Sequence, residues 1–315
     1  MPNLKKKCVL LLSGCLLSWA VNAQQGIDNA RQHATVGGQG NGAVEIDNES
    51  NEQSPITFRN SGLSLRSSMA LVVDQKSGKT LYSKNTDVRA PIASITKLMT
   101  AMVVLDAHLP LDEKLVIGNE DVDSLRNTHS RLKVGTKLSR DMALQLALMS
   151  SENRAAATLA RHYPGGFPAF IAAMNRKAAS LGMAQTHFVD STGLNSDNVS
   201  TAQDLVRMVQ AAYQYPLIRE MTTTGSYDVA MKATGRQMQF KNTNMLVRSN
   251  SWQIGLSKTG YINEAGHCLV MQAEIAKQPM IIVLLDSWGK LSRIGDAQRI
   301  KKWMESSLSS KRRYS

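Results

Sequence analysis

Cysteine is scarce in this sequence, and long apolar stretches are nearly absent. The 315 residues include three cysteines, and Cys8 and Cys15 fall in an N-terminal segment that we expect to be removed. Cys268 then stands alone, which excludes an internal disulfide, and we expect its thiol to be a buried apolar filler and not a nucleophile. Beyond residue 23 no unbroken apolar run approaches the roughly 18 residues of a membrane span. Repeats of solenoid length are also absent, so the 43% hydrophobic content predicts an ordinary globular core.

The first 23 residues have the pattern of a secretory signal peptide. Three lysines at positions 5–7 precede an apolar stretch, and small residues at 20–23 form the exit. We therefore expect cleavage after Ala23 and export to the periplasm. A competing interpretation is a lipoprotein, because residues 12–15 resemble a processing box that would leave a lipid on Cys15. The apolar stretch continues past Cys15, which favours the ordinary signal peptide.

Acidic residues are outnumbered, with 25 Asp and Glu against 37 Lys and Arg and a formal net charge of +12. For an exported protein such a charge suits the anionic cell wall or a membrane surface better than nucleic acid, and a generally solvated basic surface is the alternative. Residues 24–62 are rich in Gly, Gln and Asn and lack apolar periodicity, so we expect a flexible leader. A single folded domain is predicted at 63–310, followed by a basic tail at 311–315.

The pattern of the folded domain predicts an α+β architecture. Residues 69–74 and 79–82 indicate a hairpin around a Gly-containing turn, and residues 94–107 indicate a helix that is buried all round. Several helices are expected between 138 and 215, one of them opening with a capping-box-like start at Thr201 and Asp204. Strands return at 253–261, 266–275 and 279–285, before a final helix at 292–308. N- and C-terminal segments would then share one antiparallel sheet beside an all-helical lobe.

Three short strings carry the chemistry, and each alone is weak evidence. The first could be a helix start with a solvated lysine, the second a helix cap and the third an ordinary strand end. In this chain order, however, they form the combined motif set of penicillin-binding proteins and class A β-lactamases. The strings are Ser94-Ile95-Thr96-Lys97, Ser151-Glu152-Asn153 and Lys258-Thr259-Gly260.

The first string brings a nucleophile and a base together. Residues i and i+3 of a helix share a face, so Lys97 can reach the hydroxyl of Ser94. A lysine accepts a proton only when it is neutral, and its ordinary pKa is about 10.4. We expect burial and the nearby cation of Lys258 to lower the pKa of Lys97. Ser94 at a helix N-terminus would also offer its backbone N–H to a developing oxyanion.

The chain resembles the low-molecular-mass penicillin-binding proteins of the D-alanyl-D-alanine carboxypeptidase and endopeptidase family. Residues 89–94 and 190–194 strengthen this resemblance, and Glu152 is a small departure because Asp or Gly often stands there. The resemblance implies the serine β-lactamase/DD-peptidase-like transpeptidase fold. It also implies that Ser151 and Asn153 relay the leaving-group proton and hold the substrate amide. Lys258 and Thr259 are expected to bind the substrate carboxylate.

Two further roles are expected on the strand of the third motif. Gly260 keeps the strand surface free of a side chain so that the substrate can lie close, and the N–H of Tyr261 is the second oxyanion donor. The expected partners are peptidoglycan peptide stems and β-lactams, with weak association to membrane surfaces or wall enzymes. Neither a metal, a cofactor nor nucleic acid is expected.

The activities within this group can be ranked from the sequence. No Glu-x-x-Leu-Asn string lies between the second and third motifs, so we expect a β-lactam to inhibit the protein and not to be destroyed by it. We expect residues 261–315 to be used in completing the sheet and a last helix. In this respect the chain resembles the soluble endopeptidases that cut the D-alanyl–meso-diaminopimelate cross-link. The alternatives are a D-alanyl-D-alanine carboxypeptidase and a catalytically idle wall-binding or β-lactam-sensing protein.

Overall fold

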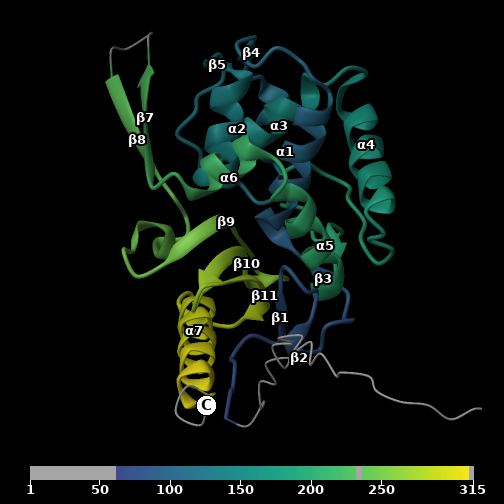
Figure 1. Cartoon of the computed structure of the whole chain (residues 1–315). Coiled ribbons are helices and arrows are strands. Elements are labelled where there is room, and N and C mark those ends of the chain that lie inside the picture. Colours follow the sequence, from purple (N-terminus) through teal and green to yellow (C-terminus); the bar gives the residue numbers. More distant parts are fainter. Residues whose placement is uncertain (1–61, 232–235, 312–315) are drawn as a thin grey trace, which may run out of the picture. The chain divides into compact units, whose positions relative to one another are not determined.

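The computed structural model describes the backbone of residues 62–231 and 236–311, and the side chains of residues 62–230 and 237–307. The expected signal peptide, most of the leader and most of the tail lie outside these residues. A five-stranded antiparallel sheet in the order β2-β1-β11-β10-β9 forms the centre of the described part (Figure 1). Its strands are β1 (Met69–Asp74), β2 (Thr80–Lys84), β9 (Gln253–Ile262), β10 (Gly266–Ile275) and β11 (Gln278–Ser287).

The expected sharing of one sheet by the two ends of the domain is confirmed. Strand β1 pairs antiparallel with β11, from Met69 opposite Leu285 to Asp74 opposite Met280. Alternate residues of a strand face opposite sides of the sheet. Ala70 and Val72 therefore pack on one side, against the C-terminal helix α7 (Ser292–Lys311), whereas Leu71 packs on the other side with the helical lobe.

The helical lobe contains the helices expected between residues 94 and 215. It comprises the buried helix α1 (Lys97–Asp106), α2 (Arg140–Met149), α3 (Asn153–Arg161), α4 (Gly166–Ser180) and α5 (Ala202–Ala212). Helix α1 is covered on nearly all sides, since eight of its ten residues are buried. None of the helices in the described part of the chain is long and apolar enough to cross a membrane.

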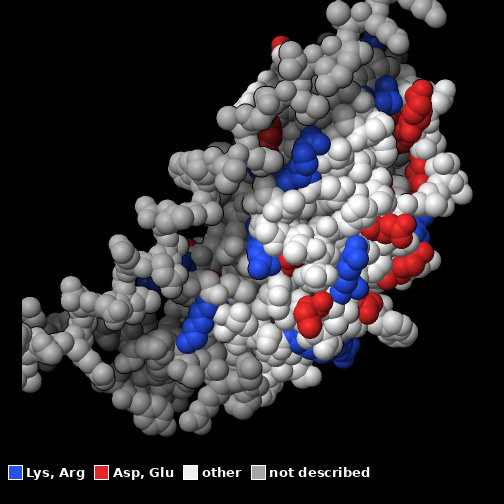
Figure 2. All heavy atoms as spheres, turned by 90° about the vertical axis from the view of Figure 1, so that its right-hand side faces the viewer, with Lys and Arg blue, Asp and Glu red and all other residues white. Residues whose placement is uncertain are grey.

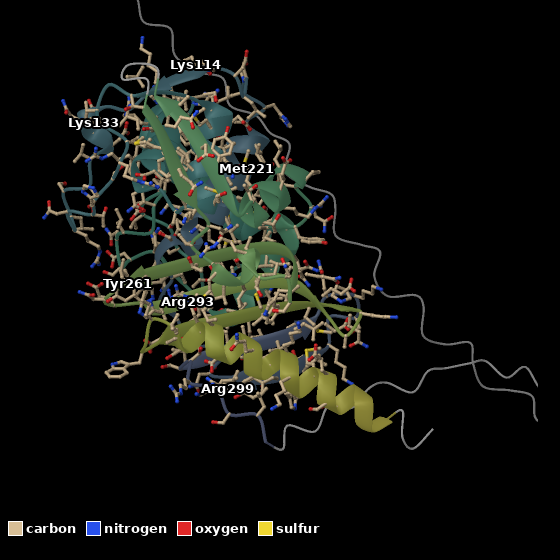
Figure 3. All side chains as sticks on the ribbon, turned by 90° about the vertical axis from the view of Figure 1, so that its left-hand side faces the viewer. Lys114, Lys133, Met221, Tyr261, Arg293 and Arg299 are labelled. Atoms are coloured by element: carbon tan, nitrogen blue, oxygen red, sulfur yellow. The ribbon has the colours of Figure 1, made fainter. Side chains whose placement is uncertain are left out.

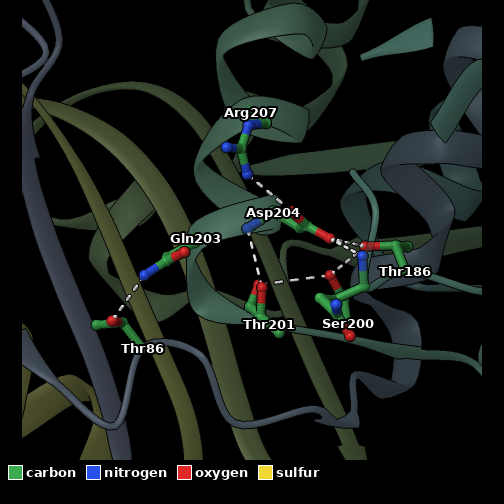
Figure 4. A network of polar contacts seen from close by, with 8 residues as sticks. Thr86, Thr186, Ser200, Thr201, Gln203, Asp204 and Arg207 are labelled. Atoms are coloured by element: carbon green, nitrogen blue, oxygen red, sulfur yellow. Dashed lines mark hydrogen bonds and ion pairs between the residues drawn. The ribbon is translucent and has the colours of Figure 1, made fainter. Parts of the chain in front are cut away.

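The capping start of α5 is confirmed only on one side. The Thr201 side chain accepts a hydrogen bond from the backbone N–H of Asp204 at 3.1 Å. The carboxylate of Asp204 does not return to the cap: it accepts from the backbone N–H of Gln185 and from Thr186 Oγ1, and it pairs with Arg207 at 2.8 Å (Figure 4). Asp204 thus ties α5 to the segment that leads into the 190–194 loop.

Several elements were not predicted. Helix α6 (Pro216–Thr223) begins with proline at its first position, a favourable place for that residue. It is followed by the hairpin β7 (Ser226–Met231) and β8 (Arg236–Lys241), which projects beside the helical lobe in Figure 1. Short paired strands also occur as β3 (Ala90–Pro91) with β6 (Val199–Ser200), and as β4 (Lys114–Val116) with β5 (Lys137–Ser139).

Candidate active site

The three motifs meet between the helical lobe and strand β9. Ser94 lies in a 3₁₀ turn (Ala93–Thr96) directly before α1, and Lys97 is the first residue of that helix. The buried helix expected from Ser94 is confirmed, although its first turn is a 3₁₀ turn and not α-helical. Lys97 still contacts the hydroxyl of Ser94, because residues i and i+3 of a 3₁₀ helix lie above one another.

Lys97 is completely buried, and its Nζ atom has three oxygen neighbours. It lies 2.8 Å from Ser94 Oγ, 2.7 Å from Asn153 Oδ1 and 2.6 Å from the carbonyl oxygen of Thr192. Burial lowers the pKa of Lys97 to about 7, although the charges of Asp190 and Glu152 act in the opposite direction. A lysine with such a pKa is often neutral near pH 7 and can accept a proton from the serine.

The second and third motifs form their own contact. Ser151 lies between α2 and α3, and its Oγ accepts a hydrogen bond from Lys258 Nζ at 2.9 Å. Lys258 is only 1% exposed. Burial, followed by repulsion from Lys97 and Arg293, lowers the pKa of Lys258 well below its ordinary value. We expected the charge of Lys258 to lower the pKa of Lys97. Instead, the charge of Lys97 lowers the pKa of Lys258.

Two residues beside the reacting groups have backbone conformations that are unusual for non-glycine residues. Ala93, just before the nucleophile, has a φ of 47°, and Ser151 has a φ of 60°. Such left-handed conformations cost of order 1–3 kcal/mol and persist only where the surroundings enforce them. Both serines are therefore held in place by tertiary packing rather than by local preference.

Gly260 packs against the turn that carries Ser94 and has no room for a side chain on that side. A Cβ atom at this position would lie 2.9 Å from the backbone nitrogen of Ser94 and 3.0 Å from the carbonyl oxygen of Ile92. We expected Gly260 to leave room above the strand for the substrate. The missing side chain also lets β9 pack against the Ser94 turn. Gly193 approaches the same turn from the other side: its Cβ would overlap the carbonyl oxygen of Ala93 at 1.9 Å.

Asp190 shapes the loop that supplies the third neighbour of Lys97. Its carboxylate accepts hydrogen bonds from the backbone N–H groups of Thr192, Gly193 and Asn195, at 2.5, 2.6 and 2.7 Å. These bonds fix the turn that aims the Thr192 carbonyl at Lys97. In the sequence, residues 190–194 only strengthened the family resemblance, and no role could be assigned to Asp190.

Asn153 and Thr259 each have partners that the sequence did not reveal. The Asn153 amide accepts from Lys97 and donates through Nδ2 to Thr128 Oγ1 at 3.1 Å, so both of its ends are engaged. Thr259 Oγ1 donates to Thr243 Oγ1 at 2.7 Å. No motif marks Thr128 or Thr243, because each becomes a neighbour only through the fold.

Tyr261 has an exposed ring. Its side chain is 54% exposed, stacks on His267 with ring centroids 4.3 Å apart, and donates through its hydroxyl to Asn263. Its backbone belongs to β9, which is an edge strand of the sheet. Peptide groups on the outer side of an edge strand are available to a ligand.

Arg293, in the first turn of α7, was missed entirely. Its Nε and Nη1 atoms are buried and have no hydrogen-bond partner among the described residues, and burial lowers its pKa. Its charge acts on Lys258 and on His267. A cation near the N-terminus of a helix opposes the helix dipole, and this unfavourable placement was the only signal that the sequence offered.

The fold and the three motifs agree with known proteins. Residues 56–289 match the D-alanyl-D-alanine carboxypeptidase family. The chain belongs to this family. The expected resemblance and the expected class, serine-type DD-peptidases, are both confirmed. Arg293 falls just beyond the matched residues.

Members of this family resemble the chain over most of their length. A D-alanyl-D-alanine endopeptidase of Pseudomonas aeruginosa is 53% identical over 241 residues, which cover 76% of this chain and 78% of the relative. The corresponding Escherichia coli endopeptidase is 49% identical over the same shares. The crystal structure of a Streptomyces DD-transpeptidase superposes with a TM-score of 0.71 at 32% identity, covering 76% of this chain and 97% of the other. The expected DD-peptidase-like fold is thereby confirmed.

Proposed function

We propose that the protein is a serine DD-endopeptidase that cleaves D-alanyl–meso-diaminopimelate cross-links of peptidoglycan through an acyl-enzyme on Ser94. The observation that carries the proposal is the buried Lys97 amine, 2.8 Å from Ser94 Oγ. In its neutral form this amine donates its two N–H bonds to Asn153 Oδ1 and to the Thr192 carbonyl. Its lone pair then faces the serine hydroxyl, as a general base requires.

The remaining groups are assigned to the steps that follow. Ser94 Oγ attacks the D-alanyl carbonyl while Lys97 takes its proton, and the backbone N–H groups of Ser94 and Tyr261 stabilise the oxyanion. Ser151 donates its hydroxyl proton to the departing amine as the C–N bond breaks, and the proton that Lys97 took from Ser94 replaces it, so that Lys97 is neutral again. Water then hydrolyses the ester and restores Ser94. Asn153 orients Lys97, and its contact with a substrate amide requires Nδ2 to leave Thr128.

Lys258 and Arg293 form the carboxylate pocket, with Thr259 beside them. The residue on the leaving side of the cut carries a free carboxylate, both in terminal D-alanine and in the D-centre of cross-linked diaminopimelate. A buried guanidinium with unpartnered donors next to a buried lysine is suited to such an anion. Gly260 allows β9 to bring Lys258 and Thr259 close to Ser94.

The choice of endopeptidase over carboxypeptidase is supported by the relatives. The 53% and 49% identical proteins are named endopeptidases, whereas the carboxypeptidase of Escherichia coli is 28% identical. Both activities act on a D-alanyl carbonyl, so the difference lies in how the leaving side is held.

Benzylpenicillin and purified muropeptides test the proposal. Intact-mass analysis should show one penicilloyl adduct on the wild type and on Ser77→Ala, a change in an exposed turn, but none on Ser94→Ala. Turnover of cross-linked dimer should exceed release of D-alanine from monomeric pentapeptide by kcat/KM. The opposite order would replace the proposal with a carboxypeptidase, and labelling without turnover of either peptide would indicate an idle sensor.

We further propose that the protein acts in the periplasm after loss of residues 1–23 and that it binds the anionic wall through its excess of basic residues. On the face seen in Figure 2, basic and acidic side chains are interspersed, so this face shows no single basic patch, and the proposed cause is the net positive charge of the chain. N-terminal sequencing of the exported protein should begin at Gln24. A lipid on Cys15 would contradict this.

A further inference from the structure

Large apolar side chains are exposed at the end of the sheet just beyond the third motif. Trp288 is 98% exposed and Leu291 60% exposed, both on the loop from β11 to α7, and the ring of Tyr261 is 54% exposed. Large exposed apolar side chains beside a site are candidates for a binding surface, and Trp and Tyr are among the residues that most often dominate binding energy. We refer to Tyr261, Trp288, Lys290 and Leu291 as the ledge.

The ledge is anchored and is not a loose loop. Ser287, next to Trp288, is fully buried, and its hydroxyl lies 2.7 Å from that of Ser67. At the other end, the backbone N–H of Ser292 donates to the carbonyl of Gly289 at 2.9 Å. The backbone of the loop is thus held at both ends, so it loses little backbone entropy when a ligand binds to it.

The strand register places the ledge beside the carboxylate pocket. Tyr261 pairs with His267 on β10, and His267 pairs with Ser287 on β11, so Ser287 lies two strand spacings, roughly 10 Å, from Tyr261, and Trp288 is the next residue. The charges of Arg293 and Lys290 both act on His267. Tyr261 and Arg293 come from β9 and α7 at the same end of the sheet, as Figure 3 shows. The ledge therefore continues outward from the pocket that holds the leaving residue.

We infer that the ledge binds the stem peptide of the departing strand when a cross-linked substrate is cut. This inference rests on the proposed endopeptidase function. A departing D-alanine spans only about 3.5 Å, so it ends in the pocket at Lys258 and Arg293. The amine side of a cross-link instead continues through the diaminopimelate side chain into a second stem peptide, which is long enough to reach Trp288.

The chemistry of the ledge matches that occupant. Stem peptides combine aliphatic segments with free carboxylates, and the ledge combines apolar surface at Trp288 and Leu291 with the ammonium group of Lys290. Binding energy from this part of the substrate is available only for cross-linked peptides. The ledge is thus a specificity-determining surface that favours the cross-link over a terminal D-alanine.

Truncation of the exposed ring tests the inference. Trp288→Ala should lower kcat/KM for a sugar-free cross-linked peptide dimer by about 10- to 30-fold, the loss expected for a binding hot spot. Release of D-alanine from pentapeptide and acylation by penicillin should stay within about two-fold. Phe167→Ala is the matched control, because Phe167 is 42% exposed on α4 and away from the ledge; it should change none of the three rates.

A binding measurement separates this inference from the proposed function. In Ser94→Ala, which cannot form the acyl-enzyme, the dimer should change tryptophan emission, and Trp288→Phe in the same background should remove that change. Equal losses for dimer and pentapeptide in Trp288→Ala would overturn the inference, as would no loss for either. A loss seen only with sugar-bearing dimers would assign the ledge to glycan and also overturn it. If the wild type prefers pentapeptide, the proposed function fails first.

Discussion

The pKa of Lys97 predicts how acylation depends on pH. Complete burial lowers this pKa to about 7, and only the neutral amine accepts the Ser94 proton. Roughly one tenth of the molecules carry the active base at pH 6 and about nine tenths at pH 8. The limiting acylation rate should therefore rise about ten-fold between these values and level off above pH 8. With an ordinary lysine, the rate would instead continue to rise about ten-fold per pH unit up to about pH 10.

Stopped-flow acylation by a fluorescent penicillin, from pH 5 to 9 at constant ionic strength, measures this profile. The limiting rate must be separated from the binding constant, because burial also lowers the pKa of Lys258 and a loss of its charge would weaken binding of the drug carboxylate. Lys97→Arg should nearly abolish acylation, since a guanidinium stays protonated, whereas Lys137→Arg, on the exposed side of β5, should be silent.

A second variant tests the cause of the shift. The Glu152 carboxylate raises the pKa of Lys97 against the effect of burial, so Glu152→Gln should move the midpoint of the profile to lower pH. A pH-independent rate, or a slope of one that persists above pH 8, would refute the assignment of Lys97 as the base. A midpoint that moves upward in Glu152→Gln would refute the electrostatic reasoning.

Three further changes probe groups that the fold brings to the site. Gly260→Ala forces a Cβ atom to within 2.9 Å of the Ser94 nitrogen, so the acylation rate should fall about 100-fold and the free energy of unfolding by about 1–3 kcal/mol. Gly225→Ala, whose nearest contact would be 3.6 Å away, is the control. Equal acylation rates in the two variants would contradict the packing argument. Thr243→Val removes the hydroxyl bonded to the third-motif threonine and should raise KM for peptides about three- to ten-fold without changing kcat, as steady-state kinetics would show. Arg293→Gln should weaken binding of peptides with a free leaving-side carboxylate by about 10- to 100-fold, and binding of their carboxamide analogues much less. Equal effects on the two kinds of peptide would show that Arg293 does not bind the carboxylate.

The sequence by itself determined the chemistry and the architecture. Apolar runs bounded by turn residues indicated strands 69–74 and 279–285, which are buried on both faces, and the buried pattern after Ser94 indicated the helix that carries Lys97. These signals are local, because each is read from a few neighbouring residues of the chain. The order of the three motifs then identified the family, since their residue types are fixed by the reaction.

Only the tertiary structure decided which other groups surround Ser94. Arg293 lies near enough to lower the pKa of Lys258 because the end of β9, the start of β10 and the end of β11, which leads into α7, meet at one end of the sheet. Thr243 contacts its partner because β9 passes beside it. No periodicity encodes such meetings, which depend on how distant segments close on one another. The left-handed turn at Ala93 is a further case, because alanine avoids that conformation in isolation and adopts it only between the backbones of Gly193 and Gly260.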